Sequence, residues 1–593
     1  MEAVTQTTGA PFVAPDNQHT TGASLRVHRR TIQARLPFAY KDALKALPGA
    51  TWDSRQRCWT FPLSALSARR LIELAPDAAA DETVTEYAAR CATVDEAIGL
   101  GIPASYSFRT ALRPAQIGAL ACVAHLDAAM LEMWMRTGKS KVIVDWVSNQ
   151  IAVRALILCP KGGVDVWVNP YCGRCNHNPQ CPLCGEFAKH SHNPPMVVGL
   201  GDGAIKRRAA DAADAVMRRR VVIVVNYDAA RCEPLRTFLL SVDWALVVLD
   251  ESHKIKSPGG ATSMFCRELA KVARKRVALT GTPIPNSPLD VYAQFRFIDQ
   301  SVFGASFNAF RNRFAVVESN TTRGGQQYPV IVRYKNLDAL AAAMSALTYK
   351  VGRDALGLPP VIQTSRYVTL GDKARKAYDQ METDLVAEIQ SADGSEYAVA
   401  QNTLTKLLRL AQIASGYLPR EDGQPEPLDS GKREALGDIL EDIGDVPVVV
   451  FCRFHTDLDA VHAACAERCI RSVELSGRRR ELAEFQNGDA PVIAVQIQVG
   501  DSCINLSRAS VVVYYSIGYS LGDYKQSLAR MEQKGKKEST LCIHIIAKNT
   551  VDDGHIHPVL RKKQSIVDFV SARIQNDSTN PQHAAGAQPD GGK

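Results

Sequence analysis

The 593-residue chain lacks a hydrophobic run long enough to cross a membrane, and it lacks a secretory signal. No apolar stretch approaches the roughly 18–20 residues that a span needs, and the N-terminus has no charged-then-apolar pattern. A large charge excess is also absent: the net charge is +8 and the pI near 8.7. That balance suits a polyanionic partner and an ordinary soluble enzyme equally. We expect an intracellular, soluble protein without a membrane partner, in the cytoplasm or nucleoid of a bacterial-type host or encoded by a virus acting there.

Closely spaced cysteines are scarce. All but four of the 15 cysteines stand singly, several in apolar runs, as Cys122, Cys159 and Cys452 do. Scattered thiols exclude a disulfide scaffold and indicate a reducing compartment.

The four remaining cysteines form a C-x₂-C-x₅-C-x₂-C array: Cys172, Cys175, Cys181 and Cys184. Two C-x₂-C hairpins can close a tetrahedral zinc site, with an iron–sulfur site or a redox dithiol as alternatives. His177, His190 and His192 are nearby as other ligands or as surface residues. We expect a zinc-binding insertion at about 168–195. Basic neighbours there suit a contact with nucleic acid or a protein partner, and equally a solvated helix face.

The chain alternates short apolar runs with helical stretches. Residues 1–22 and 576–593 are polar and aperiodic, so we expect both to be disordered. The runs read as strands are 142–147, 155–160, 221–227, 245–251, 447–453, 492–496 and 510–516. Near-continuous apolar strands between helices predict parallel sheets covered on both faces. The predicted fold class is α/β, with two parallel-sheet lobes and a helical spacer at 301–425.

A phosphate-binding loop is indicated by Gly138, Lys139 and Ser140, followed by a helix. Glycine lets the backbone approach phosphate oxygens at a helix N-terminus. Lys139 would reach the β- and γ-phosphates, and the Ser140 hydroxyl would bind Mg²⁺. The full phosphate-loop pattern is missing because Met133 stands where the first glycine belongs, so a structural turn is the alternative.

Asp250 and Glu251 strengthen this interpretation because they directly follow an apolar strand. Carboxylates at the carboxyl end of a parallel strand lie where nucleotides bind in open α/β sheets. Asp250 would hold Mg²⁺, and Glu251 would orient or deprotonate the attacking water. A solvated acidic turn is the alternative. Together with the loop, these residues predict an ATPase lobe.

The chain resembles the Swi/Snf-type ATPases of helicase superfamily two over most of residues 105–570. The resemblance is carried by the segments 112-LRPAQ, 158-LCPKGG, 250-DESH, 278-ALTGTPIPNSPLD and 503-CINLSRASVVVYYSIGYSLGDYKQSLAR. It implies two RecA-like lobes, at 105–300 and 426–575, and a DNA-dependent ATPase using ATP and Mg²⁺. It places Arg113, Gln116, Thr137, Gly138, Lys139, Ser140 and Asp250 at the nucleotide, with Gln116 reading the adenine. Thr280, Gly281, Thr282 and Gln526 would couple hydrolysis to lobe movement, and Arg530 would contact the γ-phosphate as an arginine finger.

Three parts of the chain depart from the family pattern. The phosphate loop has Arg136 where the family has glycine, the fifth motif has Asp501 and Cys503, and Gln533 followed by Lys534 replaces the sixth motif's second arginine. Glutamine cannot donate from a charged group to a transition-state phosphate. If that second arginine is the finger, hydrolysis would be about 10³-fold slower or more.

Residues 23–80 form a separate α+β unit that resembles the HARP domain of some annealing helicases. A strand, a helix and a hairpin with Trp52 and Trp59 are expected here. Arginines interleaved with aromatics would suit stacking on nucleic acid. The alternative is that both tryptophans belong to the domain's core.

The leading hypothesis is an ATP-driven translocase that moves on, remodels or anneals DNA, with duplex or branched DNA preferred over RNA. The alternatives are a strand-separating DNA or RNA helicase, and a nucleic-acid-binding scaffold with impaired hydrolysis.

Overall fold

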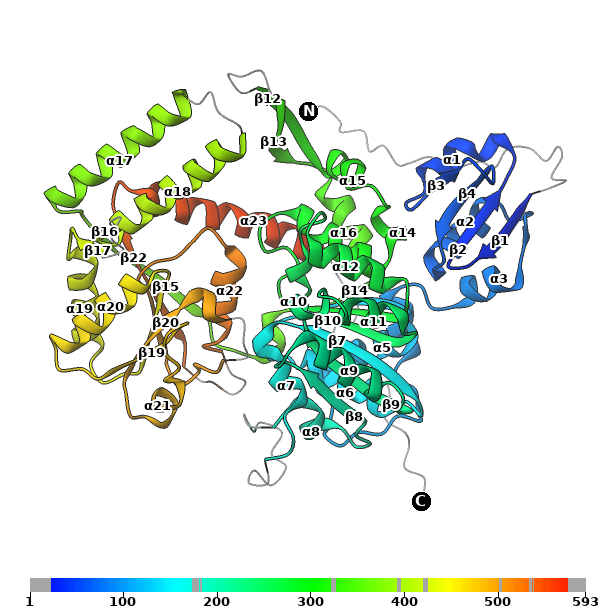
Figure 1. Cartoon of the computed structure of the whole chain (residues 1–593), viewed down its shortest axis with the longest axis horizontal. Helices are drawn as coiled ribbons and strands as arrows, with labels where there is room; N and C mark the ends of the chain where they lie inside the picture. Colours follow the sequence, from blue (N-terminus) through cyan, green and yellow to red (C-terminus); the bar gives the residue numbers. More distant parts are fainter. Residues whose placement is uncertain are drawn as a thin grey trace, which may run out of the picture.

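The computed structural model describes residues 23–172, 181, 184–321, 327–391, 396–419, 425–500, 504–532, 536 and 538–573. Cys175, His177, Asp501, Cys503, Gln533, Lys534 and both expected disordered ends lie outside these ranges. Figure 1 shows a small N-terminal module beside a first α/β lobe, with a second lobe on the other side.

Lobe 1 is built on a seven-stranded, all-parallel sheet of order β14-β6-β11-β10-β7-β9-β8. Its strands are β6 (Ala128–Met133), β7 (Val153–Cys159), β8 (Met196–Leu200), β9 (Arg220–Asn226), β10 (Trp244–Asp250), β11 (Ala273–Thr280) and β14 (Thr348–Val351). Its main helices are α4 (Val94–Leu100), α5 (Pro114–His125), α6 (Lys139–Ser148), α9 (Ile205–Ala215), α11 (Leu235–Ser241), α12 (Ala261–Ala270), α13 (Val291–Ile298) and α16 (Leu337–Ser345). The central strands are almost entirely apolar and buried, as a sheet covered on both faces requires.

The strand predicted at 142–147 is wrong, because these residues lie inside helix α6. Nearly all of α6 is buried, including Lys141 and Asp145, which form a buried ion pair, so no exposed polar face marks it as a helix. β-branched residues favour strands only weakly, and the tertiary environment decides here.

Lobe 2 contains a six-stranded parallel sheet of order β15-β22-β21-β18-β20-β19. Its strands are β15 (Val361–Val368), β18 (Val448–Cys452), β19 (Ser472–Leu475), β20 (Val492–Gln496), β21 (Val511–Tyr514) and β22 (Thr540–Ala547). Its helices are α17 (Asp372–Ser391), α18 (Glu396–Ala414), α19 (Gly431–Ile443), α20 (His455–Ala466), α21 (Leu482–Asn487), α22 (Leu521–Ala529) and α23 (His557–Arg573). Val567 of α23 packs against the cores of both lobes. The predicted pair of parallel-sheet lobes is confirmed.

The segment 301–425 is less uniformly helical than expected. It contains the hairpin β12 (Ala315–Thr321) and β13 (Gln327–Tyr334), and it supplies an edge strand to each lobe. Strand β14 pairs with β6 of lobe 1, and β15 pairs with β22 of lobe 2. β14 has only four residues, and β15 is largely exposed, so neither shows the long apolar run of a central strand.

The N-terminal module has the sheet order β3-β4-β2-β1-β5. Its elements are β1 (Ser24–His28), β2 (Thr31–Arg35), α1 (Lys41–Ala46), β3 (Thr51–Asp53), β4 (Cys58–Pro62), α2 (Ala65–Leu74), β5 (Ala79–Ala80) and α3 (Glu82–Ala89). Trp52 and Trp59 face each other across the β3–β4 hairpin with ring centroids 5.5 Å apart. Trp52 is 51% exposed, so it is not a core residue as the alternative required.

Within the described ranges, no helix is both long enough and apolar enough to span a membrane.

Candidate active site

The phosphate loop connects β6 to α6 at the carboxyl edge of the lobe 1 sheet. Gly138 has a φ of +91°, and a Cβ there would lie 2.1 Å from Gln116 Nε2. Both facts require glycine at this position. Lys139, the first residue of α6, is buried and donates from Nζ to the Met133 carbonyl at 2.9 Å. Ser140 follows it in the first turn of the helix.

Helix α5 fixes the shape of this loop. The buried Gln116 side chain donates to the carbonyls of Thr137 and Gly138 at 3.1 and 3.4 Å, and accepts from the Arg113 N–H at 2.9 Å. Arg113 donates to the Arg136 carbonyl at 3.1 Å. The structure therefore brings the predicted nucleotide residues together. Here the Gln116 amide hydrogen-bonds the loop's backbone, which positions the loop.

Asp250 ends β10 and is held from three directions. Its Oδ2 accepts from Trp167 Nε1 at 3.0 Å, its Oδ1 accepts from the Glu251 N–H at 3.0 Å, and its main-chain oxygen accepts from the Tyr227 hydroxyl at 2.8 Å. Burial, together with the Glu251 charge, raises the pKa of Asp250 to about 6, against the Trp167 hydrogen bond and the Lys139 charge. The charge of Lys139 in the phosphate loop thus acts on the Asp250 carboxylate at the strand end.

Glu251 adopts a left-handed backbone conformation (φ +51°), which is uncommon for a residue other than glycine. Its Oε2 lies 3.4 Å from His253 Nδ1, which lies 3.4 Å from Thr280 Oγ1. On the other side of the ring, His253 Nε2 is 3.2 Å from Gln526 Nε2 of lobe 2. The Gln526 amide nitrogen is a donor, so in this arrangement His253 Nε2 is the acceptor between the lobes.

His253 therefore joins the acidic strand end to Thr280, which the resemblance assigns to coupling, and to Gln526 of the second lobe. Sequence reasoning gave it no role, although it stands two positions after Glu251. Thr280 is fully buried and accepts from the Thr282 N–H at 3.0 Å. A Cβ at Gly281 would lie 3.3 Å from the Met133 carbonyl, so this segment lies directly behind the phosphate loop.

Arg136 reaches across the cleft into lobe 2. Its Nη2 donates to the carbonyls of Ile504 and Arg530 at 3.3 and 3.2 Å and to Asn505 Oδ1 at 3.0 Å. Its φ of +63° would suit glycine. The only signal in the sequence was the replacement of the family glycine, which predicted an extra charge but not a contact between the lobes.

Glu532 forms a second bridge between the lobes. This buried carboxylate accepts from Trp134 Nε1 at 2.7 Å and from Arg353 Nε at 2.6 Å, both in lobe 1. Arg530 itself is buried at the end of α22 on the lobe 2 side of the cleft. The structure thus places the backbone of Arg530 against Arg136 of the phosphate loop, and Gln526 against His253 beside the acidic strand end.

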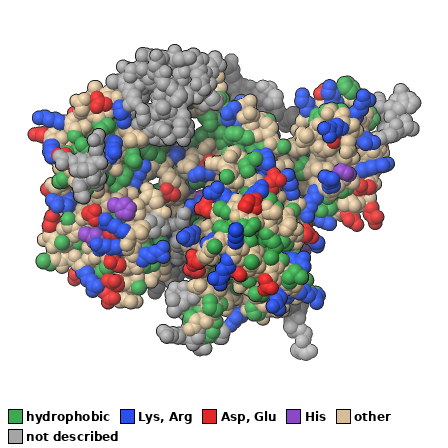
Figure 2. Space-filling model, in the orientation of Figure 1, with side chains coloured by type: hydrophobic (Ala, Val, Ile, Leu, Met, Phe, Trp, Pro, Cys, Tyr) green, Lys and Arg blue, Asp and Glu red, His purple; other side chains and the backbone are tan. Residues whose placement is uncertain are grey.

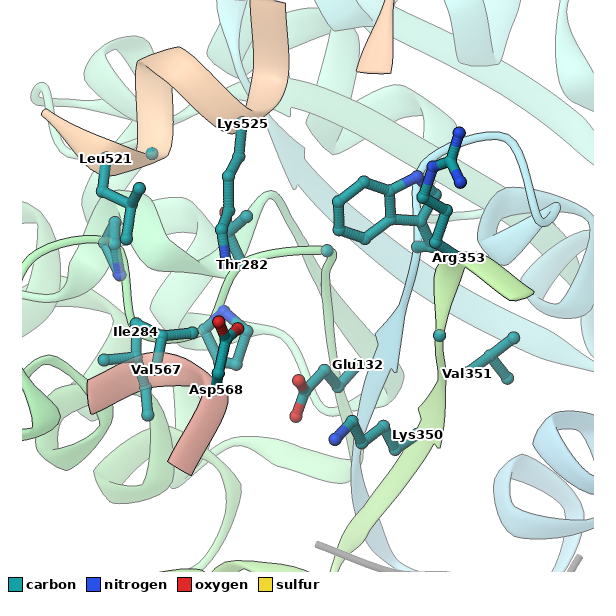
Figure 3. A pocket seen from close by; sticks show the side chains of 16 residues that line it. Glu132, Thr282, Ile284, Lys350, Val351, Arg353, Leu521, Lys525, Val567 and Asp568 are labelled. Atoms are coloured by element: carbon teal, nitrogen blue, oxygen red, sulfur yellow. The ribbon is translucent and has the colours of Figure 1, made fainter. Parts of the chain in front are cut away.

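A cavity of about 170 Å³ lies in the cleft beside this bridge. Figure 3 shows Glu132 and Lys350 of lobe 1 below Lys525 of lobe 2. Burial lowers the pKa of Lys525, against the charges of Asp568 and Glu132. The cleft is therefore lined by charged groups from both lobes.

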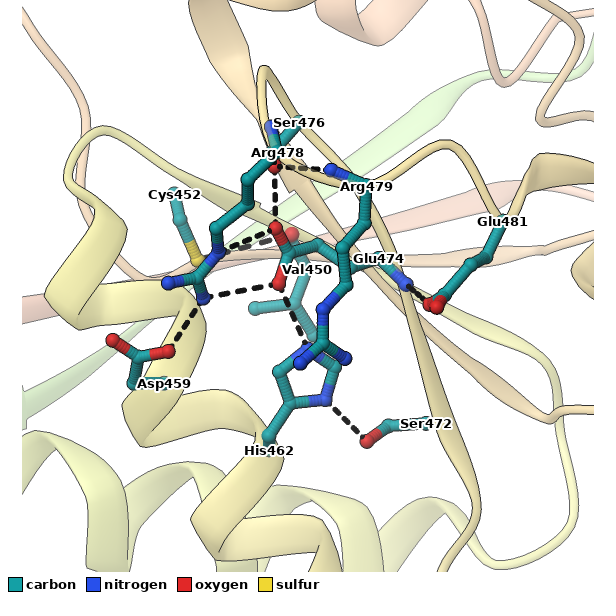
Figure 4. A network of polar contacts seen from close by, with 10 residues as sticks. All are labelled: Val450, Cys452, Asp459, His462, Ser472, Glu474, Ser476, Arg478, Arg479 and Glu481. Atoms are coloured by element: carbon teal, nitrogen blue, oxygen red, sulfur yellow. Dashed lines mark hydrogen bonds and ion pairs between the residues drawn. The ribbon is translucent and has the colours of Figure 1, made fainter.

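The outer edge of lobe 2 holds its own charged network around Glu474 of β19 (Figure 4). Burial alone would raise the pKa of Glu474, but hydrogen bonds from Arg478, Ser476 and His462 lower it to about 2. Arg478 donates to both carboxylate oxygens at 2.9 and 3.0 Å. This network fixes the turn between β19 and α21.

Three of the four predicted zinc ligands lie together. The sulfur atoms of Cys172, Cys181 and Cys184 are all within 4.8 Å of one another, and Cys172 Sγ is 3.7 Å from Cys181 Sγ. A tetrahedral site with Zn–S bonds of about 2.3 Å separates its sulfurs by about 3.8 Å. The alternative ligand His190 is hydrogen-bonded to Thr110 instead, at 2.8 Å.

Two parallel-sheet lobes, with a phosphate loop and an acidic strand end at the cleft between them, define a two-lobed ATPase. Residues 120–416 match the SNF2-related domain, and residues 431–535 match the helicase conserved C-terminal domain. The chain belongs to the SNF2-related family and carries helicase-like ATPase domains, as the resemblance predicted.

Several known proteins are similar to this chain. Putative protein p41 of Acyrthosiphon pisum secondary endosymbiont phage 1 is 28% identical over 62% of this chain and 80% of its own length. The uncharacterized ATP-dependent helicase MG018 of Mycoplasma genitalium is 24% identical over 54% of this chain and 30% of its own length. The ISWI chromatin-remodeling complex ATPase ISW2 of Saccharomyces cerevisiae is 22% identical over 70% of this chain and 36% of its own length. The chain thus spans about a third of the latter two relatives.

Among solved structures, the Sulfolobus solfataricus SWI2/SNF2 ATPase core in complex with dsDNA aligns with 82% of this chain and 98% of its own, at 20% identity and a TM-score of 0.35.

Proposed function

We propose that this protein is a DNA-dependent ATPase that couples ATP hydrolysis in the cleft to movement along DNA, remodelling or annealing it. The observation that carries the proposal is the contact chain from Glu251 through His253 to Thr280 and to Gln526 of lobe 2. Through these contacts, a structural change at the acidic strand end would be transmitted to the second lobe. Relatives named as a helicase and a remodelling ATPase support this direction.

Each cleft residue has a role in this proposal. Lys139 binds the β- and γ-phosphates above the N-terminus of α6, where backbone N–H groups favour anions. The Ser140 hydroxyl and the Asp250 carboxylate are oxygen ligands of the kind that Mg²⁺ takes; when bound, Mg²⁺ neutralises charge on the phosphates. Glu251 orients and deprotonates the attacking water, and Arg530 stabilises the γ-phosphate charge from lobe 2.

Nucleic acid is the proposed partner of the N-terminal module as well, in keeping with its HARP-like pattern. A cavity of about 820 Å³ lies between the module and lobe 1. Its lining includes Arg29 and Arg30 of the module and Arg267, Lys271, Arg274 and Arg296 of lobe 1, against the acidic residues Asp127 and Asp299. Figure 2 shows Lys and Arg side chains over the face of both parts, with acidic side chains between them. Such a lining favours a phosphate backbone.

The test is phosphate release with duplex, single-stranded and forked DNA and with RNA. We expect DNA to stimulate release. Lys139→Ala should remove the stimulation, because the β- and γ-phosphates of ATP lose the charged Lys139 side chain at the N-terminus of α6. Lys376→Ala, at an exposed position of α17 outside both proposed sites, is the control and should behave like the parent. If Lys139→Ala hydrolyses ATP as the parent does, the proposed site is incorrect.

Three further readouts separate the alternatives. Displacement of a third strand from a triplex without separation of a plain duplex supports translocation. Separation of the plain duplex favours a strand-separating helicase. Tight ATP binding with no hydrolysis on any nucleic acid favours a scaffold.

We propose that Cys172, Cys181 and Cys184, with Cys175 from the sequence pattern, bind one structural Zn²⁺. Metal analysis of the purified protein should find about one zinc per chain, and Cys184→Ser should lower that content. Cys232→Ser, at an exposed free cysteine, is the control and should keep the zinc. Iron with a visible absorption band would instead indicate an iron–sulfur cluster.

A further inference from the structure

Trp167 makes the hydrogen bond that orients the acidic strand end. The indole lies in the short helix α7 (Val164–Val168), is fully buried, and donates from Nε1 to Asp250 Oδ2 at 3.0 Å. Because the other oxygen is held by the Glu251 N–H, the indole decides how the carboxylate plane is turned. Outer-shell hydrogen bonds of this kind orient metal-binding carboxylates.

The cysteine-bearing insertion packs directly against the backbone that carries Trp167. The Gly185 N–H donates to the Asn169 carbonyl at 2.9 Å. A Cβ on Gly185 would lie 2.7 Å from the Asn169 nitrogen and 2.9 Å from the Trp167 carbonyl. Two residues later, the buried Phe187 ring lies 6.2 Å from the indole. The insertion therefore limits where Trp167 can move.

The same insertion starts at the cysteine cluster and ends on the phosphate-loop helix. Cys184, directly before Gly185, accepts from the Cys172 N–H at 3.2 Å. At the other end, Ser191 of the insertion lies 2.7 Å from Ser148 of α6, hydroxyl to hydroxyl, and both are buried. The insertion thus contacts both elements that would hold the nucleotide, α6 and, through Trp167, Asp250.

We infer that Trp167 is a positioning residue for Asp250, and that the metal-bound cysteine cluster keeps it in place. The inference rests on the proposed function and adds a regulatory input: loss or oxidation of the cysteine cluster would weaken the affinity for the magnesium nucleotide. Hydrolysis would then depend on the state of a metal site separate from the residues proposed to bind the nucleotide.

The first test compares Trp167→Phe with Trp244→Phe in the full chain. Trp244 is the matched control, because it is fully buried, begins the strand that Asp250 ends, and donates to a backbone carbonyl at 2.8 Å. The readout is the equilibrium affinity for a fluorescent ATP analogue with and without added Mg²⁺. We expect Trp167→Phe to reduce the strengthening by Mg²⁺ about 10-fold or more, as loss of an outer-shell partner does. Trp244→Phe should leave it unchanged.

A double-mutant cycle tests the insertion. Cys184→Ser should reduce the Mg²⁺ effect in the parent but add little in the Trp167→Phe background, because both changes act through one hydrogen bond. Equal effects of Cys184→Ser in both backgrounds would overturn the link to the insertion. Phe187→Ala keeps the indole N–H and should shift the Mg²⁺ effect in the same direction, which leaves the inference testable if Trp167→Phe does not fold.

Lys139→Ala separates this inference from the proposed function. If Lys139→Ala loses hydrolysis while Trp167→Phe matches Trp244→Phe, only the positioning role is overturned. If Lys139→Ala hydrolyses ATP normally, the proposed function itself fails.

Discussion

Replacing Glu251 with glutamine is expected to stop turnover while ATP remains bound. The amide has nearly the size of the carboxylate but cannot take a proton, and a general base contributes about 10²–10⁴-fold to such reactions. We therefore expect DNA-stimulated phosphate release to fall about 10³-fold. The phosphate ligands Lys139 and Ser140 are untouched, so affinity for ATP should change less than about threefold, well under 1 kcal/mol.

Single-turnover phosphate release and nucleotide binding measure the two effects separately. Glu441→Gln is the matched control, since this exposed glutamate lies on α19 and pairs with Arg468 outside both proposed sites. A Glu251→Gln protein that turns over at the parent rate would show that another group activates the water.

Replacing Arg530 with alanine is expected to have the second large effect. A guanidinium on the γ-phosphate is worth about 10³-fold or more in turnover. The main-chain oxygen of Arg530 accepts from Arg136 and from the Leu506 N–H, and alanine keeps that oxygen. The bridge between the lobes should therefore survive the substitution, so that a loss of rate reports the missing side chain.

Arg530→Lys completes this experiment, because it keeps the charge but loses the planar fork that binds two phosphate oxygens. We expect an intermediate rate for the lysine variant in stopped-flow phosphate release. Full activity of Arg530→Ala would place the finger elsewhere in the sixth motif, where Lys534 is the next cation in the sequence.

The sequence predicted those parts of the site whose residues are adjacent in the chain. Gly138, Lys139 and Ser140 form one loop, Asp250 and Glu251 follow one strand, and parallel strands bring both to one sheet edge. Local chemistry was sufficient for these. The two lobes followed from the same apolar strands.

The parts that escaped prediction depend on distant pieces meeting in space. Trp167 and Asp250 are separated by 83 positions, and Arg136 and Arg530 by 394. No periodicity marks such pairs. The helix at 142–147 was mistaken for a strand because burial on all sides removes the alternation that distinguishes the two. His253 was quoted but given no role, because its contacts appear only when lobe 2 is in place.

The N-terminal module contacts lobe 1 at the amino ends of the parallel strands. The proposed nucleotide site lies at the opposite, carboxyl ends. Arg30 donates to the carbonyl of Ala273, where β11 begins, at 2.7 Å, and Arg90 pairs with Asp127, just before β6, at 3.0 Å. Thr280 ends the same strand β11, about 23 Å away at roughly 3.3 Å per residue. A buried strand hydrogen-bonded on both sides keeps its length, so β11 keeps a fixed distance between the module and the proposed coupling residues. If the module holds DNA as proposed, that DNA would therefore stay at a constant distance from the carboxyl end of β11 in lobe 1.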